Sequence, residues 1–241
     1  MTISGAGAGA GFGGAPAVWT PDAWGTDRVL DYTADDVLVS GGLVTAFVNQ
    51  VVGGPNATQA NAALQAAEPA ARASLNGALA VLFTADAYVI ADINDTATDH
   101  ACFLVVDNQD ATTVNQYAYD AQTGRLLFSL VGGLAGYLGK YQAGPGADGW
   151  AAGSLTGAHR YGWSCDGVAG TMSGYKDGVA LAGTLAYTAM TMDAAGGFGG
   201  AYNVSQPIQN CYVGRMVALR RKRSAADETK WGAWTLAKYG V

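Results

Sequence analysis

The chain has 241 residues, of which 50% are apolar and only 13% are charged, well below the roughly 25% charged share of an average soluble domain. Its formal net charge of −6 argues against general nucleic-acid binding, because that binding depends on a basic surface. A surface so poor in charge suits a protein that is packed into an assembly or works outside the cell, and an alanine-rich composition without a special role is the alternative. No charged or proline-rich linker follows Pro16, so we expect one large domain.

The opening segment, MTISGAGAGAGFGGA, alternates glycine with alanine and differs from the rest of the chain. Such a composition cannot bury enough apolar surface to offset the entropy of ordering, so we expect residues 1–16 to form a flexible arm. A disordered tail and an arm that orders against a partner are equal alternatives. The G-x-G pattern within it is not a nucleotide motif, because no predicted strand precedes it and no helix follows.

From Val18 onward, short apolar runs alternate with glycine, asparagine and aspartate turns, a spacing typical of a β-sandwich or barrel. The run HACFLVVDNQ (100–109) is rich enough in β-branched and aromatic residues to form a central strand. In SGYKDGVALAG (173–183), the Asp-Gly pair predicts a type I′ hairpin turn. Residues 56–77 are alanine-rich but are interrupted by Pro69, so we expect irregular or partly helical structure there.

One helix is predicted, in the final segment SAADETKWGAWTLAKYG. Ser224 and Asp227 have the spacing of a capping box, and Gly240 can end the helix in the left-handed conformation. Trp231 and Trp234 are three residues apart and share one face, which we expect to pack on a sheet.

Cysteine usage and hydropathy limit the cellular setting. Cys102, Cys165 and Cys211 are too few for a disulfide framework and have no metal or redox spacing, so we expect small buried core residues. The sequence has no signal-peptide pattern and no run of the roughly 18 apolar residues that a membrane span needs. We therefore expect synthesis in the cytoplasm and no membrane insertion.

Four segments, in order, resemble the concanavalin A-like (laminin-G-like) jelly-roll domains of bacterial and phage surface proteins. The resemblance spans residues 17–241 and implies an all-β, antiparallel jelly-roll β-sandwich with a short C-terminal helix. Sugar binders, glycoside hydrolases, adhesins and virion spikes share this fold, so the fold does not fix the function. The segments are TADDVLVSGGLVTAFVNQVVGGPNATQ with LNGALAVLF, ACFLVVDN, YKDGVALAG, and VGRMVALRRKRSAADETKWGAWTLAKYG.

Catalytic and metal-binding motifs are scarce. A retaining glycosidase needs two carboxylates roughly 5–5.5 Å apart, whereas the only glutamates are Glu68 and Glu228, and the second belongs to the helix start. No nucleophile elbow or zinc-binding helix motif is present, so we expect no catalytic residue and no enzyme activity. Asp31, Asp35 and Asp36 form an acidic cluster that we attribute to turn and cap chemistry, with a calcium site as the alternative and no other cofactor expected.

Two segments are candidates for binding. Most aromatic residues of the second half are expected in the core, but the glycine-flanked GGFGGAYN predicts an exposed loop. Its Phe198, Tyr202 and Asn203 are the candidate carbohydrate-binding residues. The basic run Arg220, Arg221, Lys222 and Arg223 is either a solvated strand end or a docking surface for an acidic partner or anionic glycan.

Together, the arm and the resemblance predict a non-enzymatic virion surface protein that attaches to host cell-surface polysaccharide. It would be a head spike, fibre or decoration protein of a tailed phage or gene transfer particle, made in the bacterial cytoplasm. Its arm would bind other virion proteins, and the protein would form a homo-oligomer. The alternative is a carbohydrate-binding module of a bacterial surface or secreted protein, and a glycosidase comes third.

Overall fold

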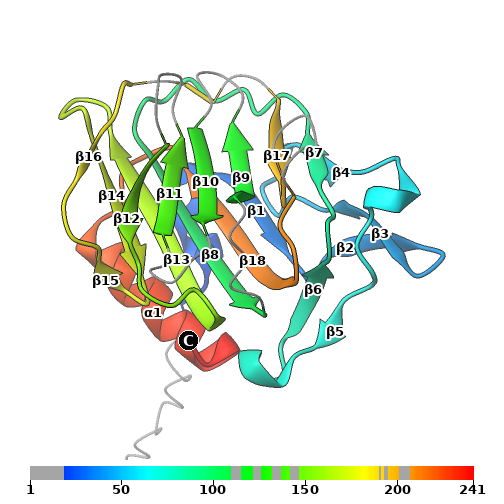
Figure 1. Ribbon diagram of the computed structural model, residues 1–241. Coiled ribbons are helices and arrows are strands. Elements are labelled where there is room, and N and C mark those ends of the chain that lie inside the picture. Colours follow the sequence, from blue (N-terminus) through cyan, green and yellow to red (C-terminus); the bar gives the residue numbers. More distant parts are fainter. Residues whose placement is uncertain are drawn as a thin grey trace, which may run out of the picture.

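Two antiparallel β-sheets and one α-helix make up the fold in the computed structural model (Figure 1). The predicted arm of residues 1–16 and the candidate binding residues Tyr202 and Asn203 lie outside its described residues. The arm boundary therefore stays a prediction. The described residues are 19–109, 115–121, 126–131, 137–141, 147–189, 191–192, 195–200 and 207–241.

The first sheet is built around β8, the run predicted to be a central strand. β8 is buried along its whole length and pairs antiparallel with β13 on one side and β18 on the other. The sheet order is β15-β14-β13-β8-β18-β6-β5, with β1 also on β18 and β16 also on β14. These strands are β1 (Arg28–Thr33), β5 (Ala70–Ala71), β6 (Leu79–Phe83), β8 (His100–Asn108), β13 (Gly157–Asp166), β14 (Thr171–Lys176), β15 (Val179–Ala180), β16 (Leu185–Ala186) and β18 (Cys211–Leu219).

The second sheet has the order β12-β11-β10-β9-β17-β7-β4-β3-β2. Strand β17, which comes last in the sequence among these strands, lies between β7 and β9. It therefore inserts into the middle of a sheet whose other strands come earlier in the chain. Such non-sequential antiparallel neighbours are typical of Greek-key and jelly-roll sandwiches. These strands are β2 (Val37–Ser40), β3 (Leu43–Phe47), β4 (Ala57–Thr58), β7 (Tyr88–Ile90), β9 (Asn115–Ala121), β10 (Leu126–Val131), β11 (Tyr137–Tyr141), β12 (Ala147–Ala151) and β17 (Gly196–Phe198).

An aromatic cluster lies in the core between the two sheets, and it contains Phe198. The ring of Phe198 packs edge-to-face on Phe47 and Phe83, at centroid distances of 4.9 and 5.6 Å. Only 1% of Phe198 is exposed. The prediction of an exposed binding loop is therefore wrong for Phe198, because β17 pairs within the sheet on both sides.

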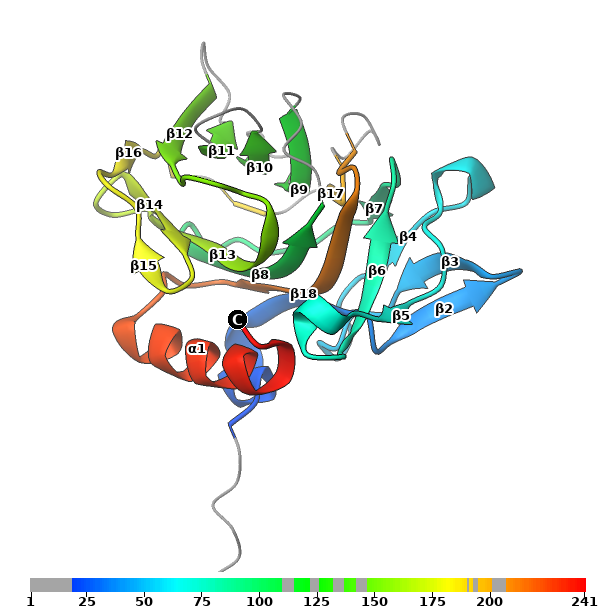
Figure 2. The same ribbon diagram turned by 60° about the horizontal axis from the view of Figure 1, so that its bottom comes forward.

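Helix α1 (Ala225–Tyr239) forms a third layer on the outer face of the first sheet (Figure 2). Trp231 stacks on Trp24 of the 3₁₀ helix η1 (Pro21–Asp27), which in turn stacks on Phe103 of the sheet. The capping box is confirmed, since the Ser224 hydroxyl accepts from the Asp227 amide and the Asp227 carboxylate accepts from the Ser224 amide. The first sheet is thus covered on both faces.

The predicted hairpin turn between β14 and β15 is confirmed. Asp177 and Gly178 have φ values of 50° and 87°, and both central residues of a type I′ turn need positive φ. Residues 56–77 are irregular as expected, with only short strands and the 3₁₀ helices η2 (Ala62–Leu64) and η3 (Ala73–Leu75).

The three cysteines are buried free thiols, as predicted. Burial raises the pKa of the Cys102 and Cys211 thiols far above their ordinary value. Neither thiol is therefore a reactive nucleophile at neutral pH. Within the described part of the chain, no helix has both the length and the apolar character to span a membrane.

Candidate functional site

A groove of about 390 Å³ lies between the β14–β15 turn and the outward face of α1. Arg160 of β13, Asp177 of the turn and Glu228 of α1 bring charged groups to it. Val179 and Leu236 are 69% and 63% exposed and line the same groove. An open hollow that combines exposed apolar side chains with a few charged groups has the composition of a ligand site.

Two glycines leave space for the side chain of Arg160. A Cβ on Gly178 would lie 2.5 Å from Nη2 of Arg160 and 2.8 Å from Oε1 of Glu228. A Cβ on Gly232 of α1 would lie 3.1 Å from the same Nη2 atom. The absence of side chains at both positions leaves space for the guanidinium between turn and helix.

Arg160 also fixes the turn to β13. Its backbone amide donates to the Asp177 carboxylate at 3.1 Å, and its Nη2 donates to the Asp177 carbonyl at 3.0 Å. The other Asp177 oxygen lies 2.8 Å from Nδ1 of His159, whose Nε2 lies 3.1 Å from the Thr156 carbonyl. Burial raises the Asp177 pKa, but the bonds from His159 and the Arg160 amide outweigh it, so the pKa is lowered.

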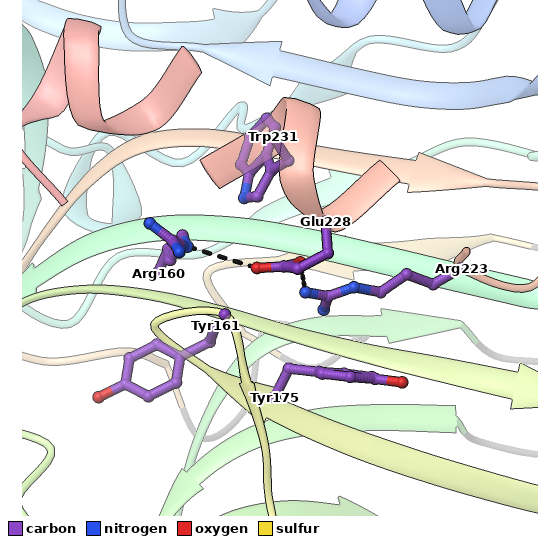
Figure 3. A pocket seen from close by; sticks show the side chains of 7 residues that line it. Arg160, Tyr161, Tyr175, Arg223, Glu228 and Trp231 are labelled. Carbon is purple, nitrogen blue, oxygen red and sulfur yellow. Dashed lines mark ion pairs between the residues drawn. The ribbon is translucent and has the colours of Figure 1, made fainter. Parts of the chain in front are cut away.

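Glu228, in the first turn of α1, lies between two arginines (Figure 3). Its Oε1 is 3.6 Å from Nε of Arg160, and its Oε2 is in close contact with Nη2 of Arg223. The Arg223 guanidinium also stacks 3.7 Å above the ring of Tyr175. Burial lowers the pKa of Arg160, and lowers that of Arg223 to about 10.

A second hollow, too narrow to hold a water molecule, lies on the inner side of the Arg160–Glu228 pair. Tyr161, Tyr175 and Trp231 line it, and it shares Arg160, Gly178 and Glu228 with the open groove. The ion pair therefore separates an aromatic cavity from the open groove.

The basic run after β18 is not the free cationic patch that the docking hypothesis needs. Arg223 is buried against Glu228 and Tyr175, and Arg221 binds both oxygens of Asp227. The two exposed members also face acids, so the charge of the run is balanced within the chain. The remaining pairs are Arg220 with Asp95 at 3.9 Å, Arg221 with Asp27 at 2.6 Å and Lys222 with Asp166 at 2.8 Å.

The three aspartates of the acidic cluster do not converge on one point. Asp31 is fully buried, and both its oxygens bind Arg215, one of them also Arg28. Asp35 contacts Lys238, and Asp36 accepts from Gln50 at 2.6 Å. The described residues contain no group of three or more histidine, cysteine or acidic side chains that could hold a metal ion. The calcium alternative therefore has no support from these aspartates.

Sequence reasoning missed Arg160 and Glu228 as site residues. Glu228 was assigned to the helix start, and Arg160 lies in a strand that reads HRYGW. Gly178 and Gly232, which make room for Arg160, were the available signal. These glycines are recognised as part of the site only when the fold shows that the Arg160 side chain passes over them.

No family model matches the sequence, and no curated protein matches it. Among solved structures, domain 4 of AbnA, a GH43 extracellular arabinanase from Geobacillus stearothermophilus, in complex with arabinotriose, has a TM-score of 0.59 at 15% identity. That match covers 86% of this chain and 98% of the domain.

Two larger proteins contain the same architecture. Trypanosoma rangeli sialidase in complex with sialic acid matches with a TM-score of 0.59 at 14% identity, over 90% of this chain and 33% of that one. The botulinum neurotoxin serotype D binding domain matches with a TM-score of 0.53 at 9% identity, over 88% and 51%. This chain spans about a third of the length of the sialidases. The predicted jelly-roll β-sandwich is confirmed. Because the sequence identities are this low, the matches show the fold alone.

Proposed function

We propose that this protein is a non-catalytic glycan-binding domain and that its glycan binds in the groove between β15 and α1. One observation carries the proposal: the fold match includes almost all of the arabinanase domain that was solved with arabinotriose. A sandwich of this size and topology is therefore sufficient to hold an oligosaccharide. The binding site in that domain is not carried over, because the identity is only 15%.

The groove has the chemistry that a sugar needs. Val179 and Leu236 offer apolar surface to the C–H face of a sugar ring, while Arg160, Asp177 and Glu228 offer hydrogen-bonding groups to its hydroxyls. Its volume of about 390 Å³ lies within the range of roughly 300–1,000 Å³ for small-molecule sites. A short stretch of glycan fits these dimensions.

The charges around Glu228 favour binding over catalysis. A glycosidase acid must hold a proton near neutral pH, whereas two neighbouring arginines stabilise the ionised carboxylate. The second carboxylate of the groove, Asp177, has a lowered pKa. Asp177 is therefore not suited to donate a proton to a glycosidic oxygen at neutral pH.

Glycan-array binding followed by calorimetry, with arabinotriose among the ligands, tests the proposal. Val179→Asp should weaken binding about tenfold or more, because it removes apolar contact and adds a charge beside the sugar. Val168→Asp is the matched control, since Val168 is 96% exposed on the β13–β14 turn and does not line the groove. Equal binding by both variants would place the site elsewhere, and no bound glycan at all would contradict the function.

The proposal includes the biological setting that the sequence favours, which is the surface of a virion. A virion surface protein of a phage or gene transfer particle would use the groove to attach to host polysaccharide and the arm to join other virion proteins. The low charged content and the Gly/Ala-rich arm support this setting. A carbohydrate-binding module of a bacterial surface or secreted protein would use the same groove without the arm.

A further inference from the structure

Five polar atoms of the residues that line the aromatic cavity have no hydrogen-bond partner among the described residues. They are Nε1 of Trp231, Nε of Arg160, Nε of Arg223, and Oε1 and Oε2 of Glu228. All four residues line the cavity, and only 1% of Trp231 is exposed. In Figure 3 the indole nitrogen of Trp231 lies on the side of the ring that faces Arg160 and Glu228.

Buried polar atoms without partners oppose folding, so their retention calls for a reason. Three of the five atoms carry N–H donors, and the two Glu228 oxygens are acceptors. A hydroxyl group matches this set, because it accepts through its oxygen and donates through its hydrogen. A carboxylate or phosphate would bring acceptors and negative charge beside Glu228, and an ammonium group cannot accept from Trp231.

The ion pair is a weak barrier between the two hollows. Nε of Arg160 and Oε1 of Glu228 are 3.6 Å apart, and neither atom forms a hydrogen bond with any described residue. The open groove offers about 390 Å³ on the outer side of the pair, into which the Arg160 side chain can turn when its Nη2 releases the Asp177 carbonyl. Glu228 stays in place through Arg223.

We infer that one hydroxyl of the bound glycan enters between Arg160 and Glu228, accepts from the indole N–H of Trp231 and donates to the Glu228 carboxylate. This assignment rests on the proposed glycan-binding function and names the atoms that recognise the ligand. It predicts neutral sugars with free hydroxyls as the ligand class, because the acids and arginines of the groove leave no unpaired cation for an acidic sugar.

Nuclear magnetic resonance of the full chain tests the inference without any change at the site. Each of the six tryptophans has one indole N–H group, and Trp231→Phe identifies the signal of interest. Titration with arabinotriose, or with the tightest array glycan if arabinotriose does not bind, should shift the Trp231 signal in step with calorimetric binding. The indole of Trp24, which already donates to Asp227 at 2.7 Å, is the internal control and should not shift.

Glu228→Gln supplies the matching variant, because it keeps the shape of the side chain and removes the charged acceptor. Affinity should fall about tenfold or more, and Glu68→Gln, a change at the other glutamate, which is exposed, should leave it unchanged. If Glu228→Gln does not fold, the wild-type titration decides the question alone.

The outcomes separate the two claims. Saturating glycan binding with a stationary Trp231 signal overturns the inference and leaves the glycan-binding function intact. Binding that Glu228→Gln does not weaken in a folded variant also overturns it. If neither arabinotriose nor any array glycan binds, the proposed function fails and the inference fails with it.

Discussion

Gly178 has two separate roles at the edge of the groove. Its φ of 87° belongs to the type I′ turn, and its missing side chain leaves space for Arg160 and Glu228. Asp177, the other central residue, also has positive φ, which aspartate adopts more readily than most residues. The sequence could predict the first role from the Asp-Gly pair but not the second.

Gly178→Val should lower the free energy of unfolding by about 2 kcal/mol or more, since a β-branched residue is forced to positive φ and its Cβ meets two charged groups. Gly183→Val is the matched control, because Gly183 also has positive φ (80°) but has no atom within 4 Å of a built Cβ. Chemical denaturation of both variants measures the difference. Equal losses would mean that the space over the turn does not matter, and no loss at either would contradict the turn assignment.

Phe198 illustrates what sequence cannot decide at the level of one residue. Glycine on both sides predicts an exposed loop, yet Gly196 and Gly197 pair with β7 and β9 as ordinary strand residues. Strands β7 and β9 lie far from β17 in the sequence, so the residues next to Phe198 do not indicate that these strands pair with it. The same limit applies to the basic run, whose acidic partners come from four separate segments.

At the scale of elements, α1 was predictable because its signals are local. Ser224 and Asp227 are three residues apart, and their reciprocal bonds form the predicted capping box. Asp227 has further partners that the sequence does not reveal: it accepts from Arg221 and from the indole of Trp24. The cap therefore also joins α1 to η1 and to the segment that precedes α1.

This cap gives the fold a sensitivity to acid. Burial raises the Asp227 pKa, but the bonds from Arg221, Ser224 and Trp24 outweigh it and hold the pKa well below its ordinary value. A carboxyl whose pKa is lower in the folded state stabilises above its unfolded pKa of roughly 3.9, and this contribution is lost as the pH falls below it.

The free energy of unfolding should therefore decrease between about pH 5 and pH 2, and Asp227→Asn should flatten this decrease. Urea denaturation across that range measures the slope. Asp36→Asn, at an exposed aspartate, is the control and should keep the wild-type slope. A wild-type slope in Asp227→Asn would show that the cap does not titrate with unfolding.

At the scale of the whole molecule, the groove is a product of the sandwich. Arg160 comes from β13, Asp177 from the hairpin and Glu228 from α1, and only the packing of α1 on the first sheet brings them together. Residue patterns predicted the hairpin and α1 separately. They could not predict the groove, because its position depends on contacts between distant segments.

The arm belongs to the same scale, since its predicted role concerns assembly. Its composition is mostly glycine and alanine, which add little apolar side-chain area to a core, so deletion of residues 2–14 should leave the melting temperature unchanged. The same deletion should abolish oligomerisation or incorporation into particles. Light scattering and particle purification measure these effects. Particles with a normal complement of the truncated protein would make the arm a passive tail.

The crystal structure of the full chain with its tightest glycan tests the central claim most directly. We predict sugar density between Val179 and Leu236, with one hydroxyl about 3 Å from Nε1 of Trp231 and Arg160 turned toward the groove. Sugar bound on the outer face of the second sheet, with Arg160 and Glu228 still paired, would contradict the account.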